Sequence, residues 1–479
     1  MPKGKHAMIG VSVATTALRG VPRMEEQAEV ARRRARRLGH PILVSVTVAV
    51  KPRDPLGLFA RGLGITHNRL FWSLPATGLA VAGLGAAWSF AANGPDRFTA
   101  AAAAWRDLIA TAAIDADPAL PFSGPMAAAG FAFDPLRSPG GLWDGYADGL
   151  LLLPRLVLAS DGFRASLTLN GLVGGSTSSI ALYLTAARRL RDLLGRAWRA
   201  PRVGTGVTLE DALPPGTWRG IVAEAVSDLN AGRLEKVVLA REVRAHTATP
   251  FDPAATLAAL RRDYPETFVF AVARGGRTFL GASPERLVSL RGRDVAASAL
   301  AGSAPRGKTP TEDAAFGQAL LASAKDREEH AVVVRMLRTA LADACERVAA
   351  PIAPTLMRLR NVQHLFTPIT GTVAGTTGIL DLVGRLHPTP ALGGQPRTEA
   401  LAWIREREQL DRGWYGAPVG WVDARGQGEF AVAIRSALVG RHEASLFAGA
   451  GIVAASDPER EERETDIKLK AMLGALGAG

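Results

Sequence analysis

The feature that most constrains the fold is a pair of apolar segments joined by two glycines. FVFAVAR and RTFLGAS flank Gly275 and Gly276. Glycine adopts the positive φ angles that a two-residue hairpin turn requires, so the two segments are expected to form antiparallel strands. Other strand-like segments cluster on both sides of this hairpin, with helical segments between the clusters. This order predicts an α+β fold with large sheets.

The remaining segments follow the same alternation. Period-two or continuous apolar runs predict strands at 40–51, 124–135, 148–160, 164–173 and 235–246, and two short strands within 70–95. Helical spacing predicts helices at 96–114, 178–198, 252–265, 311–348 and 458–476, and one that begins near Trp218. Residues 200–217 are rich in Gly, Pro and Thr and mark the clearest break, which separates an N-terminal part, 1–210, from residues 211–479.

Net charge limits the possible partners without choosing one. The chain carries +12 and includes the run Arg32–Arg37, which is typical of a solvated helix face but also of a nucleic-acid-binding surface. No nucleic-acid motif accompanies the charge. We favour a solvated basic surface together with a small anionic substrate that is attracted by the positive electrostatic field of the protein.

Cysteine and hydropathy patterns indicate a cytoplasmic protein. The chain has one cysteine, Cys345, so an intrachain disulfide is excluded. Cys345 lies in an apolar-periodic stretch that predicts a buried helical position. The start of the chain lacks the apolar core of a signal peptide. The uncharged run 70–95 contains proline and several glycines, so strands are expected there instead of a membrane span.

The last predicted helix carries the most informative polar pattern. Asp457 suits an N-cap and Pro458 the first helical position. One face then presents, at helical spacing, Glu461, Glu464, Thr465 and Lys468. Two carboxylates one turn apart can bind one magnesium ion, but a solvated face with ion pairs to Arg460 and Arg463 fits the segment equally.

Three further charged residues admit both a chemical and a structural interpretation. Lys236 opens a strand and would act as a base only with a lowered pKa, whereas most lysines at strand ends are solvated. Glu285 follows Ser-Pro at a strand end and would act as an acid only where its surroundings raise its pKa. Glu329 in KDREEH is a third carboxylate, or an exposed residue near a helix start.

Several familiar sites are absent from the sequence. Gly449 and Gly451 in AGAGIV bring strands close together or expose backbone N–H groups to an anion, and do not form a dinucleotide motif. No pair of histidines has zinc-like spacing, and lone histidines such as His364 and His387 are most often structural.

Taken together, the motifs resemble the chorismate-utilising enzymes, a family that includes isochorismate synthase, salicylate synthase, anthranilate synthase component I and aminodeoxychorismate synthase component I. The resemblance is carried from about 218 to 476 by KVVLARE, FLGASPERL, ALAGSAPRG, LLASAKDREEH, NVQHLF, LHPTPALGG, RGWYGAPVGW, GEFAVAIRSA, AGAGIV and SDPEREERETDIKLKAM. Residues 1–200 resemble isochorismate synthases more loosely. The resemblance implies one large unit of two packed, mostly antiparallel sheets with helices outside, in which 1–210 complete the scaffold and 211–479 bind chorismate.

The resemblance also implies a role for each site residue. Lys236 is implied as the base that activates water for attack on C2 of chorismate, and Glu285 as the acid that protonates the departing C4 hydroxyl. Magnesium is implied as the cofactor, held by Glu329, Glu461 and Glu464. The residues implied to hold or line the substrate are Gly302, His364, Ala391, Leu392, Tyr415, Arg435, Gly449, Gly451 and Lys468.

Two positions favour the isochorismate synthase branch. Ala301 stands where aminodeoxychorismate synthases have a nucleophilic lysine, so no covalent aminated intermediate can form there. Ala391 stands where anthranilate and salicylate synthases have a hydroxylated residue, and an apolar side chain there is expected to favour release of isochorismate before pyruvate is eliminated. Glu462 departs from the family, which usually has tryptophan there, and either adds negative charge near the metal or points outward.

The resemblance therefore implies an isomerase, a magnesium-dependent isochorismate synthase. The alternatives are a salicylate synthase that goes on to eliminate pyruvate, a noncatalytic basic protein that binds nucleic acid, and a synthase coupled to an amidotransferase. We expect chorismate as the only partner, with no nucleic acid, membrane or glutaminase subunit, and a monomer or weak dimer. Isochorismate is the precursor of menaquinone, catecholate siderophores and salicylate, and the sequence does not choose among them.

Overall fold

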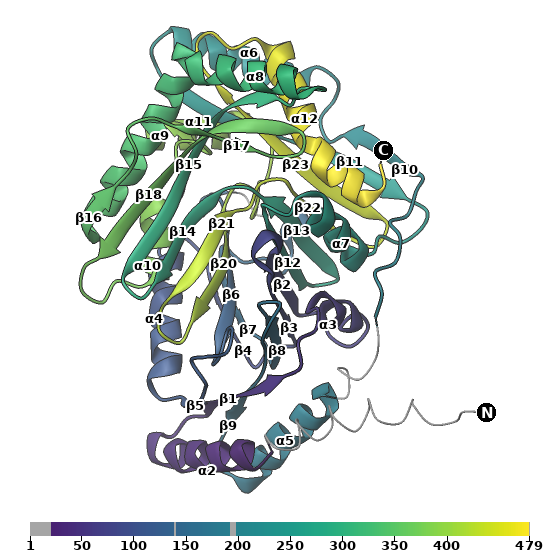
Figure 1. Ribbon diagram of the computed structural model, residues 1–479, viewed down its shortest axis with the longest axis vertical. Helices are drawn as coiled ribbons and strands as arrows, with labels where there is room; N and C mark the ends of the chain where they lie inside the picture. The colour runs from purple at the N-terminus through teal and green to yellow at the C-terminus, as the bar shows by residue number, and fades with distance from the viewer. Residues whose placement is uncertain (1–20, 138–139, 192–197, 479) are drawn as a thin grey trace.

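Two large β-sheets pack against each other and form the frame of the molecule (Figure 1). The computed structural model describes residues 21–137, 140–191 and 198–478. Within them the first sheet has 13 strands, namely β1 (Ile42–Val50), β2 (Arg69–Leu74), β3 (Leu79–Leu84), β5 (Ala113–Asp115), β8 (Leu156–Ser160), β9 (Ala165–Val173), β10 (Val207–Asp211), β11 (Lys236–Thr247), β12 (Phe268–Arg274), β13 (Arg277–Ser283), β19 (Gly394–Gln395), β22 (Ser436–Val439) and β23 (Glu443–Ile452). The second sheet has 10 strands, namely β4 (Trp88–Ala92), β6 (Met126–Phe131), β7 (Gly149–Leu153), β14 (Arg286–Arg291), β15 (Asp294–Pro305), β16 (Cys345–Ala349), β17 (Thr355–Arg358), β18 (Val362–Val373), β20 (Pro418–Asp423) and β21 (Gly428–Val432).

Strand pairing confirms the predicted α+β class. The path through the first sheet runs β10-β11-β23-β22-β13-β12-β2-β3-β8-β9-β1-β5, and β19 pairs with β11. The second runs β16-β18-β15-β14-β21-β20-β6-β7-β4, and β17 pairs with β18. Among the described strands only β1 and β5 pair in parallel. Gly275 and Gly276 have φ of +58° and +83° and join β12 to β13, as the hairpin prediction required.

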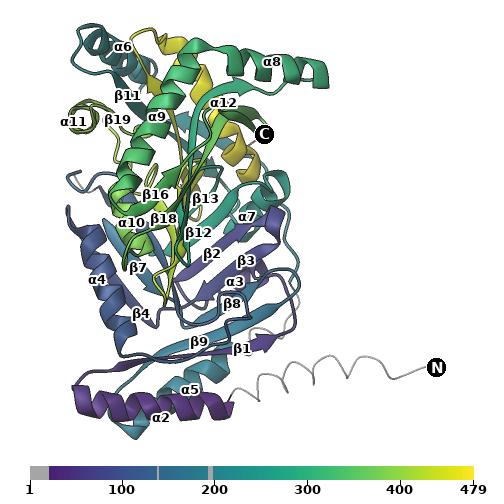
Figure 2. The ribbon, with the colours of Figure 1, turned by 60° about the vertical axis from the view of Figure 1, so that its left-hand side comes forward.

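Helices cover the outer faces of both sheets (Figure 2). They are α2 (Val21–Leu38), α3 (Leu56–Arg61), α4 (Arg97–Ala110), α5 (Thr177–Arg191), α6 (Thr217–Asn230), α7 (Pro253–Asp263), α8 (Pro310–Ala322), α9 (Ala324–Ala342), α10 (Ile379–Leu386), α11 (Arg397–Arg407) and α12 (Pro458–Leu476). Two short 3-10 turns span Pro75–Thr77 and Gly141–Trp143. Helices α2, α3, α5, α7 and α12 pack on the first sheet, and α4, α9 and α10 on the second.

The core between the sheets is aromatic. Phe270 and Phe279 of the first sheet pack there with Trp421 of the second. Their neighbours Val269 and Ala271 face the opposite side, toward the helices, because successive side chains on a strand alternate between its faces. The alternation gives each sheet two buried faces, and this explains why several strands read as continuous apolar runs.

Strands from before and after residue 210 are interleaved in both sheets. β2 pairs with β12, and β6 pairs with β20. The expected boundary at 210–211 falls inside β10, which pairs with β11 as the edge of the first sheet. That residues 211–479 need the preceding residues in order to fold stays a prediction.

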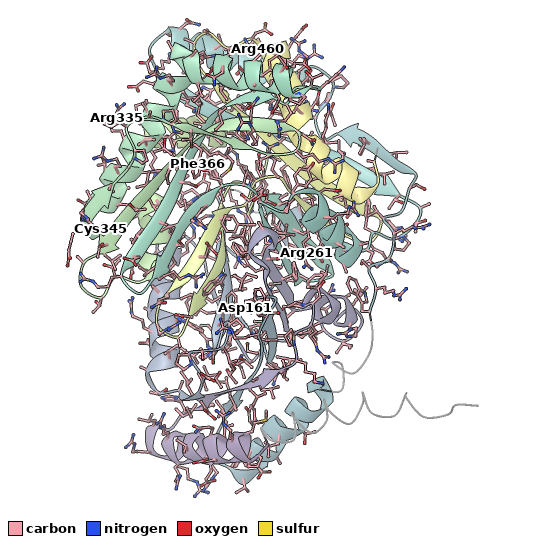
Figure 3. All side chains as sticks on the ribbon, viewed as in Figure 1. Asp161, Arg261, Arg335, Cys345, Phe366 and Arg460 are labelled. Carbon is pink, nitrogen blue, oxygen red and sulfur yellow. The ribbon has the colours of Figure 1, made fainter. Side chains whose placement is uncertain are left out.

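The prediction of a single helix at 311–348 was wrong, because the structure has two helices and the start of a strand there. Two helices, α8 and α9, meet at Ser323, whose backbone is extended and whose hydroxyl accepts the N–H of Asp326 as an N-cap. Cys345 is buried as expected but lies in strand β16, which pairs with β18 (Figure 3). Pairing with an existing sheet edge overrides a helical apolar period in a segment this short.

The structure shows what the uncharged run 70–95 and the basic run Arg32–Arg37 form. The run 70–95 forms three strands, β2, β3 and β4, one more than expected. None of the described helices is long and apolar enough to cross a membrane. The expectation about a signal peptide concerns residues 1–22, of which 1–20 lie outside the described residues. In α2, Arg34 donates to the carbonyl of Thr111 over 3.0 Å and Arg36 to that of Gly175 over 2.8 Å, so part of the basic run binds its own chain.

Candidate active site

One cavity gathers every residue for which the family resemblance implied a catalytic, metal-binding or substrate-binding role. Its volume is about 420 Å³, and it opens where β11, β15, β18 and β23 meet α9 and α12. Its walls include Lys236, Glu285, Gly302, Glu329, His364, Ala391, Leu392, Tyr415, Arg435, Gly449, Gly451, Glu461, Glu464 and Lys468. Figure 1 shows α12 lying along β11 and β23, which brings the last helix beside β11, a strand from the middle of the chain.

Lys236 is the first residue of β11, and its side chain is buried in this cavity. It is 8% exposed, and its Nζ donates to Oε1 of Glu329 over 2.5 Å. Val238, two residues on, lines the same wall, whereas Val237 and Leu239 enter the apolar core on the other face. Period-two alternation thus points the amine into the cavity and anchors its strand behind it.

Glu285 is a buried carboxyl that favours its protonated form. It follows β13 and is 5% exposed, and its carbonyl accepts the N–H of Val432 over 3.0 Å. Burial raises its pKa to about 8, although the charges of Lys236 and Lys468 act in the opposite direction. At neutral pH the side chain is therefore an uncharged acid that can donate a proton into the cavity.

Arg435 and His364 form one wall of the cavity, which we call the cationic wall. Its charge is that of Arg435, because the imidazole of His364 is neutral. Burial and, next, the charge of Arg435 lower the pKa of His364 to about 3. Its Nδ1 lies 3.2 Å from the carbonyl of Gly302, and its Nε2 lies 3.5 Å from Nη2 of Arg435. The imidazole is thus an acceptor toward Arg435, whose guanidinium keeps its charge and faces the cavity.

The backbone at Arg435 is strained. Its φ is +52°, which is uncommon for a residue with a Cβ, and its carbonyl accepts the N–H of Ala282 over 3.0 Å. This conformation at the turn between β21 and β22 aims the side chain at the cavity. Tyr415 stands nearby, and burial raises the pKa of its phenol, so the hydroxyl stays protonated as a donor.

Helix α12 presents two carboxylates and a lysine to the cavity, as its spacing predicted. The carboxylate of Asp457 accepts the N–H of Arg460 over 2.8 Å and starts the helix. Glu461 accepts the hydroxyl of Ser456 over 2.7 Å, and Glu464 pairs with Lys468 over 2.6 Å.

The pKa values of the two carboxylates of α12 shift in opposite directions. Burial, and also the charge of Glu464, raise the pKa of Glu461. Burial acts the same way on Glu464, but the charge and hydrogen bond of Lys468 outweigh it and lower its pKa. Lys468 is also held by the carbonyl of Gly449 over 2.9 Å.

Three glycines shape the wall. Gly302, with φ of +75°, is the extra residue of a β-bulge between β15 and β18. A Cβ on Gly449 would lie 3.2 Å from the hydroxyl of Tyr415. A Cβ on Gly451 would lie 3.0 Å from Cε of Lys236. The glycines of AGAGIV thus leave room for the tyrosine and the lysine.

The three predicted metal ligands share the cavity without forming a finished cation site. No described group of three or more His, Cys, Asp or Glu side chains is close enough to hold an ion. Glu329 instead pairs with Lys236 and Glu464 with Lys468. The set still suits a hard divalent cation, since the three carboxylates line one cavity from two helices, and a cation would offset the burial and the charge of Glu464 that raise the pKa of Glu461.

Glu462 points away from the cavity. It pairs with Arg219 over 2.7 Å and lies 3.8 Å from Arg241. It is absent from the cavity wall, so of the two expected alternatives the structure supports the outward one.

The sequence interpretation missed part of the wall. Lys325 and Asp326 precede Glu329 on α9, and Arg460 precedes Glu461 on α12. Helical spacing from the chosen glutamates could have indicated them, because residues three or four apart share a face. Strand alternation from Lys236 could likewise have indicated Val238, whereas Phe447, which also lines the cavity, carried no such signal.

A buried amine, a protonated carboxyl, three carboxylates and a cationic wall around one cavity define an enzyme site for a small polyanion. The chain belongs to the chorismate binding enzyme family, which matches residues 27–477. It is 40% identical over 447 residues to the salicylate biosynthesis isochorismate synthase of Pseudomonas aeruginosa, covering 93% of this chain and 92% of that protein. It is 38% identical to the isochorismate synthase MenF of Bacillus subtilis, over 93% and 95%. The structure of the menaquinone-specific isochorismate synthase MenF from Escherichia coli matches 94% of this chain and 100% of that chain, with a TM-score of 0.77 and 27% identity.

Proposed function

We propose that the protein is an isochorismate synthase, an isomerase that moves a hydroxyl group of chorismate from C4 to C2. One observation carries the proposal: the amine of Lys236 and the carboxyl of Glu285 line the same cavity, and Glu285 is protonated at neutral pH. The two relatives that span most of the chain are both named isochorismate synthases, which supports the same reaction.

The residues divide the reaction between its two ends. In its unprotonated form, the amine of Lys236 would accept a proton from a water molecule while the water oxygen bonds to C2. The ring double bonds shift, the bond between C4 and its oxygen breaks, and Glu285 donates its proton to the departing oxygen, which leaves as water. One water enters and one leaves, so the overall change is an isomerisation, and both side chains return to their starting states by exchange with solvent.

The cationic wall would hold the carboxylates of the substrate. Arg435 and the hydroxyl of Tyr415 face the cavity as donors, and the neutral imidazole of His364 lines the same cavity, where it would lie beside the ring of the substrate. We propose that Gly302, Leu392, Gly449, Gly451 and Lys468 complete this wall. Buried donors act strongly there because little water competes with them.

We propose magnesium as the cofactor, held by Glu329, Glu461 and Glu464. Such an ion, when bound, neutralises the ring carboxylate and polarises the ring. Hard oxygen donors of this kind suit magnesium, which keeps positions for water and substrate oxygens. A cytoplasmic location, a monomeric or weakly dimeric state and independence from a glutaminase subunit are further parts of the proposal. The apolar Ala301 in place of a lysine argues against the aminodeoxychorismate synthase branch.

The test incubates the protein with chorismate and magnesium and follows isochorismate and pyruvate separately. We expect isochorismate without pyruvate, no turnover in Lys236→Ala, and magnesium binding by that variant close to wild type. Lys470→Ala, which changes an exposed lysine on the same helix as the glutamates, should behave as wild type. Stoichiometric pyruvate would identify a salicylate synthase, and full activity of Lys236→Ala would remove the lysine from the mechanism.

A further inference from the structure

A charged pair is buried directly behind the cavity wall. Glu408 and Arg412 follow α11 and are 1% and 4% exposed. Nε of Arg412 donates to Oε1 of Glu408 over 2.6 Å, and its Nη2 donates to the other carboxylate oxygen. The pair is therefore bidentate, which fixes the plane of the guanidinium.

The same two side chains bind the backbone of two wall segments. Arg412 donates to the carbonyl of Val238 over 2.7 Å and to that of Leu392 over 3.0 Å. The carboxylate of Glu408 accepts the N–H of Ala240 over 2.8 Å. Strand β11, which carries Lys236, is thus joined through side chains to the segment of Ala391 and Leu392.

Two more contacts hold the guanidinium in place. It lies over the ring of Phe133, 4.2 Å from the ring centroid. The carbonyl of Arg412 accepts the N–H of Tyr415 over 2.8 Å, so the turn that carries this cavity residue is tied to the same pair. Neither Glu408 nor Arg412 lines the cavity itself, so neither touches a molecule bound in it.

Stability alone is a poor explanation for this arrangement. Burial removes the hydration of both charges, and an apolar pair of similar volume is often as stable or more stable. What an apolar pair cannot supply is the set of directed bonds to Val238, Ala240 and Leu392.

We propose that Glu408 and Arg412 are positioning residues that fix the Ala391–Leu392 segment against strand β11. They would thereby hold the ring of the substrate in line with the amine of Lys236. This inference rests on the proposed isochorismate synthase activity. A displacement of about 1 Å between reacting groups lowers rates by about a hundredfold, so a loosened wall affects turnover more than binding.

The test is the double variant Glu408→Leu/Arg412→Met, which removes both charges and keeps the volume. We expect a folded protein with a thermal midpoint within about 4 °C of wild type. We expect kcat to fall by tenfold to a hundredfold, on the order set by misplaced reacting groups, while KM for chorismate and the affinity for magnesium change by less than about threefold. Arg412→Lys, which keeps the charge but loses the fork, should fall between wild type and the double variant.

A matched control is Arg137→Met. Arg137 pairs with Asp411 over 2.5 Å, with side chains 11% and 17% exposed, next to the same turn but without a bond to β11 or to Leu392. We expect wild-type kcat from this variant.

A stable double variant with wild-type kcat overturns the positioning role, and so does an equal loss of kcat in Arg137→Met. Either result leaves the proposed function standing if the wild type converts chorismate. A wild type that does not convert chorismate removes the proposed function, and the positioning role is then refuted with it.

Discussion

Replacing Glu285 by glutamine separates the catalytic use of the carboxyl from its effect on stability. Glutamine has nearly the same shape and carries no charge at any pH. The variant cannot protonate a departing hydroxyl, so turnover should be lost. The same change removes a group whose folded-state pKa is raised to about 8 from an ordinary value of 4.5.

The sign of the stability effect follows from that shift. Below pH 4.5 the carboxyl is protonated in both states, so its burial brings no penalty from ionisation. Between pH 4.5 and about 8 the unfolded chain ionises while the folded chain does not, so the wild type loses stability as the pH rises. Above pH 8 the loss is constant.

The magnitude is large enough to measure. Each pH unit above the ordinary pKa contributes about 1.4 kcal/mol, so the penalty at pH 7 is roughly 3 kcal/mol. Glu285→Gln should therefore be more stable than wild type by about that amount at pH 7 and by little at pH 4.5. Denaturant unfolding of both proteins from pH 4.5 to 9, without magnesium, measures the difference.

The control is Glu346→Gln, an exposed carboxylate whose side chain is 57% accessible. Its pH profile of the unfolding free energy should match wild type. A difference between Glu285→Gln and wild type that is zero, or that stays the same from pH 4.5 to 9, would refute the buried, protonated carboxyl.

Three further changes test other parts of the site and fold. Gly451→Ala puts a methyl group 3.0 Å from Cε of Lys236 and 3.4 Å from Oε1 of Glu329, and should lower kcat/KM for chorismate by about tenfold or more with little change in the thermal midpoint. Ala391→Thr adds a hydroxyl to the wall and should release pyruvate from chorismate, as a coupled assay would detect. Residues 210–479 expressed alone should be insoluble or inactive, because the strands that complete both sheets are missing.

Each of these has a clear opposite result. Wild-type turnover of Gly451→Ala would mean that the lysine does not need the space beside that glycine. An unchanged product distribution in Ala391→Thr, with no pyruvate, would remove that position as the discriminator. A soluble, fully active fragment would show that the N-terminal strands are dispensable.

Local chemistry explains which elements the sequence could predict. Asp457 and Pro458 are unambiguous signals of a helix start, and α12 runs from Pro458 to Leu476 as expected. The two glycines at 275–276 predicted their hairpin for the same reason. The break at Ser323 was missed because the segments on both sides favour a helix, and only the capping bond of its hydroxyl separates them.

Tertiary contacts explain what the sequence could not predict. The motifs named the cavity residues through a family resemblance, but the pairing of Lys236 with Glu329 joins a strand to a helix far along the chain. Glu408 and Arg412 have the spacing of an ordinary surface pair, and only the packed fold shows that they are buried. The strand conformation of Cys345 likewise depends on the pairing of β16 with β18, which lies elsewhere in the chain.

Isotope labelling tests most directly whether Lys236 and Glu285 act at opposite ends of the ring. The protein is incubated with chorismate and magnesium in water enriched in oxygen-18, and the product is analysed by NMR and mass spectrometry. We predict isochorismate with the heavy oxygen at C2 and the original C4 oxygen released to solvent. Product that retains the original oxygen, or no product at all, would contradict water addition by this pair of residues.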